Sequence, residues 1–146
     1  NLMTAATKDP LAFAVIYLWI GFVCAISFME AWLKFRAPGV NLQIGLGIGR
    51  LIFNALNKVE WVFAIALMIS LFNSKDTIYA PSNLFFYLPL VLLIIQTIWL
   101  LPALDTRAQM HIDGKVVPAS NLHLYYVGIE IIKTIFLFIY SIKFLK

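Results

Sequence analysis

The sequence predicts an all-α integral membrane protein, a bundle of four transmembrane helices in a single domain. Of its 146 residues, 62% are hydrophobic and only 12% are charged, with a mean hydropathy of +0.91, whereas a soluble domain is about half apolar and about a quarter charged. The apolar residues form four long runs separated by short polar connections. Because one bilayer crossing takes about 20 apolar residues, we expect spans at 11–36, 44–72, 84–104 and 120–142.

The first span has clear signals at both ends. Asp9 can cap the helix, and Pro10 occupies the first helical position, where its missing N–H costs nothing. The apolar run is too long for a signal peptide, so we expect a retained span. Glu30 and Lys34 are spaced to pair across one helical turn, and a break is expected at residues 37–39, Ala-Pro-Gly.

The second span begins at the glycines Gly45, Gly47 and Gly49. Their spacing does not fit a dinucleotide-binding loop, because no strand precedes them and the last glycine is misplaced. The pair Gly45 and Gly49 instead forms a small-residue surface that permits close helix packing, either within the bundle or between copies of the chain.

The third and fourth spans are separated by the most polar connection, residues 105–120. Pro102 marks the point at which the third helix should kink or end. Ser120 or Asn121 can cap the fourth helix. Four spans place both termini on one side of the membrane. Of the Lys and Arg residues near the span ends, five lie on the side of the first and third connections and four on the other side, which slightly favours a cytoplasmic location of the first and third connections. The five are Lys34, Arg50, Arg107, Lys115 and Arg36.

Polar residues within the second and fourth runs are the main functional signal, because ionisable groups in a membrane span are costly unless they are paired or functional. At 100° per residue, Arg50, Asn54 and Asn57 share one helical face, with Glu60 beside it. The candidate ligand- or ion-binding residues are Arg50, Asn54, Asn57, Glu60, His123, Glu130 and Lys133.

Two interpretations of these residues stay open. The first is structural: ion pairs such as Glu60 with Lys133, or Glu130 with Lys58, hold the helices together. The second is a polar cavity between the second and fourth helices for a substrate, ion or proton. There Glu60 and Glu130 would exchange a proton or cation, Arg50 and Lys133 would neutralise them or hold an anion, and the asparagines would orient a ligand.

Other chemistries find little support in the residues. Cys24 is the only cysteine, so no intrachain disulfide can form. His111 and His123 could join a carboxylate around a metal, but no tight histidine spacing supports it, and we assign no metal ligand and no catalytic residue. The sequence identifies no cofactor. Without a dense basic cluster, a nucleic-acid partner is not expected.

The second span resembles part of the membrane-associated eicosanoid and glutathione metabolism family. Arg50, Asn57 and Glu60 match its Glu-Arg-x-x-Arg-Ala-x-x-Asn-x-x-Glu run, while Gly49 and Phe53 replace the first glutamate and the second arginine. This partial resemblance implies a four-span, glutathione-dependent membrane enzyme.

Over its whole length the chain resembles the small four-span family that includes transmembrane protein 205 and uncharacterised bacterial proteins. The matching positions are Trp19-Ile20-Gly21-Phe22, Gly49-x-x-Ile52-Phe53, Leu101-Pro102, Arg107 and His123. This resemblance implies the four-span fold and a location in a bacterial inner membrane, without implying a chemistry.

The function that we predict is a non-enzymatic membrane protein that binds or transports a small ligand, ion or proton at a polar site inside the bundle. Two alternatives remain: an accessory subunit of a larger membrane complex, and a glutathione-dependent membrane enzyme. The expected partners are the lipid bilayer and further subunits, either copies of the chain or members of a larger complex.

Overall fold

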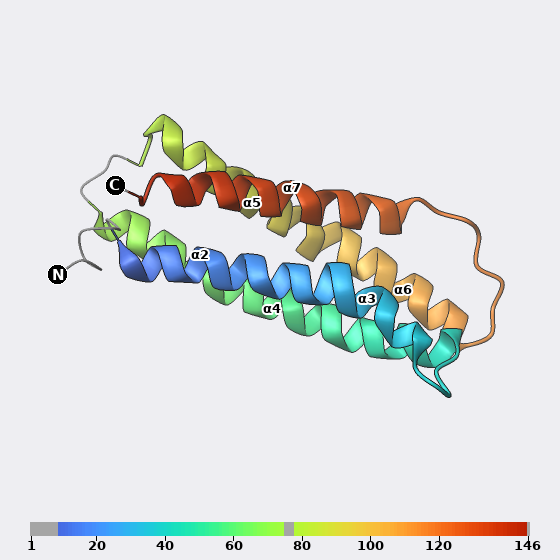
Figure 1. Ribbon diagram of the computed structural model, residues 1–146. Helices are drawn as coiled ribbons and strands as arrows, with labels where there is room; N and C mark the ends of the chain where they lie inside the picture. The colour runs from blue at the N-terminus through green and yellow to red at the C-terminus, as the bar shows by residue number, and fades with distance from the viewer. Residues whose placement is uncertain (1–8, 75–77, 146) are drawn as a thin grey trace.

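The computed structural model describes residues 9–74 and 78–145, and it contains four long helical spans. They cover Pro10–Arg36, Leu42–Asn73, Pro81–Ile112 and Leu122–Ile142, each long and apolar enough to cross a membrane. The spans lie side by side in one elongated bundle, and the start of the first lies at the same end as the end of the fourth (Figure 1). The all-α, four-helix prediction is confirmed.

The first span is one continuous rod built from four segments: α2 (Pro10–Val23), the π-helix η1 (Cys24–Glu30), α3 (Ala31–Leu33) and the 3₁₀ turn η2 (Lys34–Arg36). Asp9 caps it as predicted, since its Oδ1 accepts a hydrogen bond from the backbone N–H of Ala12 at 3.1 Å. The expected pair also forms, with 3.5 Å between Lys34 Nζ and Glu30 Oε2.

The second span, α4 (Leu42–Asn73), starts two residues before the predicted bound because Asn41 caps it, accepting from the N–H of Ile44 at 2.8 Å. Its glycines pack within the bundle. A Cβ at Gly45 would lie 2.1 Å from the Phe35 ring, and one at Gly49 would lie 3.1 Å from Lys34 Nζ. The expected small-residue surface therefore receives the end of the first span.

Replacing Gly45 by alanine should destabilise the protein by about 1–3 kcal/mol, because the added methyl group overlaps the Phe35 ring. The matched control is Gly128→Ala, where nothing lies within 4 Å of the new Cβ and helix propensity predicts a gain of about 0.5–1 kcal/mol. Thermal unfolding in detergent measures both. Equal effects of the two substitutions would contradict the packing role of Gly45.

The third span differs from its prediction. It comprises η3 (Pro81–Asn83), α5 (Leu84–Ile95), the π-helix η4 (Gln96–Leu100) and α6 (Leu101–Ile112). The helix therefore continues eight residues beyond the predicted end at 104, through half of the expected loop. Pro102 does not end it, because it sits in the first turn of α6, where a missing N–H is tolerated after the wider π turn. The span is followed by a turn at Asp113-Gly114, with Gly114 at φ +73°.

The fourth span, α7 (Leu122–Ile142), follows Asn121. Of the two predicted capping residues, Ser120 makes the bond: its Oγ accepts from the N–H of Leu122 at 3.1 Å, whereas Asn121 makes no side-chain cap. In the bundle α7 packs against α2 and α5, and α4 packs against α2 and α6. The second and fourth spans consequently lie diagonally opposite each other, with the first span on one side and the third on the other (Figure 1).

Apolar side chains occupy both the interior and the outer surface. Trp19, Phe86 and Leu93 are fully buried in the core, while Leu51, Val62 and Ile98 are 64–75% exposed on the outside. Such an apolar exterior would be poorly soluble in water, and together with spans of this length it indicates an integral membrane protein.

Candidate functional site

A group of polar side chains is buried inside the bundle, and we name it the charge cluster: Trp19, Ser27, Glu60, Gln96, Glu130 and Lys133. Lys133 stands at its centre. Its Nζ lies 2.6 Å from Glu60 Oε1, 2.7 Å from Glu130 Oε1 and 2.5 Å from Gln96 Oε1. The contacts with Glu60 and Gln96 are hydrogen bonds, and the contact with Glu130 is an ion pair.

The two carboxylates of the cluster have further donors. Trp19 Nε1 donates to Glu60 Oε1 at 2.8 Å. Glu130 accepts from Gln96 Nε2 at 2.6 Å through Oε1 and from Ser27 Oγ at 2.9 Å through Oε2. Each of the four spans thus contributes at least one side chain. Because Glu60 and Lys133 lie on diagonally placed helices, the cluster ties together elements that make little direct contact.

Two π-helical segments deliver cluster residues. Ser27 lies within η1, and Gln96 is the first residue of η4. A π turn accommodates one more residue than an α turn, which rotates the side chains that follow, and such turns occur frequently at functional sites. The first and third spans therefore both depart from regular α-helix at the level of the cluster.

The charges of the cluster do not balance. Glu60, Glu130 and Lys133 are at most 1% exposed, and in the described residues both glutamates form their ion pairs with the same lysine. Two carboxylates and one ammonium carry a net charge of −1 when all are ionised. Burying unbalanced charge in a low-dielectric interior is strongly unfavourable.

The predicted polar face of α4 instead meets the third span. Arg50 binds Asp105 through two bonds, Nε to Oδ1 at 2.7 Å and Nη2 to Oδ2 at 2.9 Å, and it also donates to Gln109. Asn54 donates to the carbonyl of Arg50 at 2.8 Å and to Asp105 at 3.5 Å. This bidentate geometry is the strongest form of arginine–carboxylate pairing.

Asn57 forms a separate contact one turn further along α4. Its Nδ2 donates to Thr97 Oγ1 at 3.0 Å, and Trp61 Nε1 donates to the same oxygen at 2.9 Å. Thr97 in turn donates to the carbonyl of Leu93 at 2.7 Å. These bonds join α4 to the third span and leave Asn57 outside the charge cluster.

The structure thus divides the seven predicted site residues. Glu60, Glu130 and Lys133 meet, and the ion pair of Glu60 with Lys133 that we expected is present. The alternative pair of Glu130 with Lys58 is wrong, because Lys58 is exposed and Glu130 binds Lys133. A single site shared by all seven residues between the second and fourth helices does not form, since those helices lie diagonally and the third span binds Arg50, Asn54 and Asn57.

Sequence reasoning missed six partners: Trp19, Ser27, Gln96, Thr97, Asp105 and Gln109. Gln96 had a usable signal, because it is an amide inside the apolar run of the third span. Trp19 and Ser27 had none, since tryptophan and serine are ordinary residues in membrane helices. Asp105 was placed in the expected loop, so its contact with α4 could not be anticipated.

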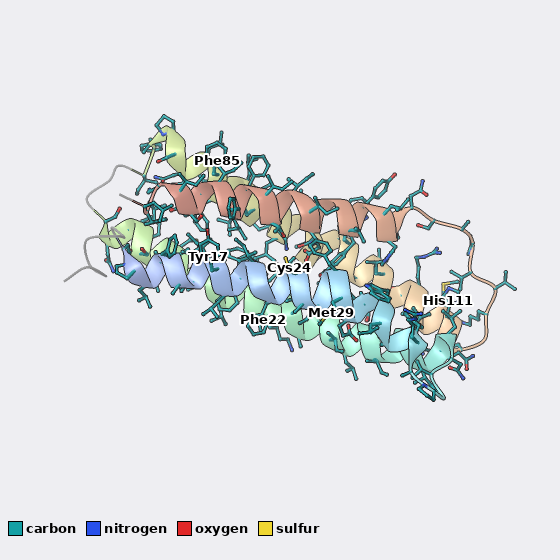
Figure 2. All side chains as sticks on the ribbon, viewed as in Figure 1. Tyr17, Phe22, Cys24, Met29, Phe85 and His111 are labelled. Carbon is teal, nitrogen blue, oxygen red and sulfur yellow. The ribbon has the colours of Figure 1, made fainter. Side chains whose placement is uncertain are left out.

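A cavity of about 240 Å³ lies at the end of the bundle that carries the connections 37–41 and 113–121, and we name it the basic cavity. Its walls come from the end of the first span, the start of α4, α6 and the start of α7. Its charged and titratable lining residues are Lys34, Arg50, Asp105, Arg107, His111, His123 and Tyr126. Figure 2 shows His111 at this end of the bundle. His123, Arg50 and Asn54 line the same cavity and lie outside the charge cluster.

No metal site is evident: in residues 9–74 and 78–145, no three His, Cys, Asp or Glu side chains lie close enough to hold an ion.

No protein-family model matches the sequence, and no curated protein or solved structure is significantly similar to it.

Proposed function

We propose that the protein is an integral membrane protein whose charge cluster binds one exchangeable proton and so supports the movement of protons, alone or with a small ligand. The observation that carries this proposal is the enclosed 2:1 ratio of carboxylates to ammonium at Glu60, Glu130 and Lys133. One bound proton makes the cluster neutral, which removes the largest electrostatic cost of burying it.

A proton suits this geometry better than a metal cation. The ammonium of Lys133 already fills the space between the two carboxylates, at 2.6 and 2.7 Å. A sodium or calcium ion would need several oxygen ligands around its own volume, whereas a proton needs only an acceptor oxygen. Because Lys133 pairs directly with both glutamates, we propose a proton, rather than a metal ion or a larger ligand, as the species bound at the charge cluster.

Two hydroxyl side chains lie between the cluster and the basic cavity. Ser27 donates to Glu130, and Tyr126 interacts electrostatically with Glu130 and with Ser27. Tyr126 in turn lines the basic cavity. Ionisable side chains inside membrane spans form proton relays, and we propose that Glu130, with Ser27 and Tyr126 beside it, is the entry point for protons from this end.

Infrared spectroscopy of the purified protein at neutral pH should detect one protonated carboxyl group. Glu60→Gln and Glu130→Gln should each abolish its C=O band, because the remaining carboxylate is then balanced by Lys133. Glu30→Gln is the matched control, since Glu30 pairs with Lys34 at the end of the first span, and it should leave the band unchanged. A wild-type spectrum without the band would refute the bound proton.

Proton movement is tested in liposomes that contain a pH-sensitive dye and carry an imposed potassium diffusion potential. Wild-type protein should acidify or alkalinise the lumen faster than empty liposomes do. Glu60→Gln and Glu130→Gln should reduce the rate at least tenfold, whereas Glu30→Gln should retain it. Unchanged flux in both cluster variants at every pH would exclude a role of the cluster in transport.

The proposed location is a bacterial inner membrane, as implied by the resemblance to bacterial four-span proteins. Membrane fractionation of a bacterial host that expresses the chain tests this: the protein should sediment with inner-membrane markers. Recovery with outer-membrane or soluble markers would contradict it.

A further inference from the structure

We infer that the basic cavity is a binding site for a phosphate group, carried by the headgroup of an anionic phospholipid. This inference does not depend on the proposed proton site. It rests on the charges that line the cavity, on its apolar walls and on its position at the end of the bundle.

The lining of the cavity has more positive than negative charge. Arg50 is neutralised by its bidentate pair with Asp105, and Lys34 is partly balanced by Glu30 at 3.5 Å. Arg107 is different, because in the described residues it forms no ion pair, and its Nη2 donates only to the carbonyl of Pro118, at 2.7 Å. One guanidinium charge therefore lines the cavity without a carboxylate.

The remaining polar groups can add to the attraction for an anion. His123 also lines the cavity and can donate a hydrogen bond through a ring nitrogen. Lys34 also lines the cavity, and its Nζ lies close to Gly49. A guanidinium, an ammonium and an imidazole that line one cavity supply donors of the kind that bind phosphate oxygens.

The other walls of the cavity are apolar, with Phe35, Leu46, Phe53, Leu101 and Leu104 among them. The volume of about 240 Å³ leaves room for a phosphate headgroup. Apolar walls beside basic groups favour an amphiphile, whose acyl chains stay in the bilayer, over a fully polar anion.

The position of the cavity fits the same ligand. The first and third spans end here, and the second and fourth begin here, so the cavity lies at the depth of lipid headgroups when the bundle crosses a bilayer. Basic pockets between transmembrane helices on the cytoplasmic side bind anionic headgroups. The distribution of Lys and Arg slightly favours a cytoplasmic location for this end of the bundle.

The test is the thermal stability of the purified full chain in a neutral detergent with added phosphatidylglycerol, phosphatidylcholine or inorganic phosphate. Wild-type protein should be stabilised by phosphatidylglycerol at concentrations at least tenfold below those needed for phosphatidylcholine. Arg107→Gln should lose at least tenfold in apparent affinity, and Lys34→Gln should show a loss in the same direction. Lys58→Gln, which removes an exposed lysine of α4 outside the cavity, should respond as the wild type does.

Each outcome decides the inference. Stabilisation by phosphatidylglycerol that inorganic phosphate does not reproduce identifies the lipid as the source, and stabilisation by inorganic phosphate alone would assign the site to a soluble phosphate and overturn the lipid. Equal responses of wild type and Arg107→Gln, or equal effects of the two lipids, would overturn the site itself. If Arg107→Gln fails to fold because its bond to Pro118 is lost, Lys34→Gln carries the same comparison.

Discussion

Replacing Lys133 by methionine will lower the free energy of unfolding by about 3–5 kcal/mol, because it leaves the buried carboxylates of Glu60 and Glu130 without their shared cation. Methionine fills a similar volume, so the loss reports charge rather than a cavity. SDS titration of the protein in detergent micelles measures it. The loss should shrink as the pH falls, since protonation neutralises the carboxylates that lysine no longer balances.

The compensated variant separates charge from structure. A triple substitution, Glu60→Gln, Glu130→Gln and Lys133→Met, removes every charge of the cluster and should recover most of the lost stability, because replacing a whole buried ion cluster is often neutral or stabilising. Lys58→Met is the matched control on the exposed face of α4 and should change stability by less than about 0.5 kcal/mol. If Lys133→Met were as stable as the wild type at high pH, the cluster as described here would be wrong.

Replacing Trp19 by alanine will cost about 3–5 kcal/mol, because this side chain is fully buried in the core and its removal leaves a large cavity. It also removes the bond from Nε1 to Glu60 Oε1. Trp19→Phe keeps most of the packing and isolates that bond, whose loss should account for about 1.5–3 kcal/mol, as expected for a hydrogen bond to a charged group.

The control for Trp19 is Trp99, which is 50% exposed on the outer surface of η4. Trp99→Ala should change the stability by less than about 1 kcal/mol, because little of its contact area faces other residues of the chain. Unfolding of the three variants under one set of conditions makes the comparison. A larger loss of stability for Trp99→Ala than for Trp19→Ala would contradict the burial of Trp19 in the core.

The long-range contacts that could be anticipated were those that depend on residue type alone. Glu60 and Lys133 were expected to pair because opposite charges in apolar helices seek each other wherever geometry permits. Gly45 was expected to receive a close neighbour because only a residue without Cβ allows such an approach. Neither expectation required knowledge of which helix faces which.

The partners of Arg50 depended on geometry that residue types do not contain. Asp105 lies beyond the predicted end of the third span, and its reach to Arg50 exists only because α6 continues through Pro102 to Ile112. Pro102 was expected to kink or end the helix, as proline does in a regular α-helix interior. The π turn before it provides the relief that makes a first-turn position available.

The sequence by itself determined four apolar helices, their approximate ends and the presence of costly polar groups inside them, because hydropathy and capping act within a few neighbouring residues. Only the tertiary structure decided which polar groups meet. Each π turn inserts one residue and so rotates the following side chains by about 100°, which breaks the helical periodicity on which sequence reasoning relies. Ser27 within η1 and Gln96 at the start of η4 both reach Glu130, whereas Arg50 lies at the basic cavity.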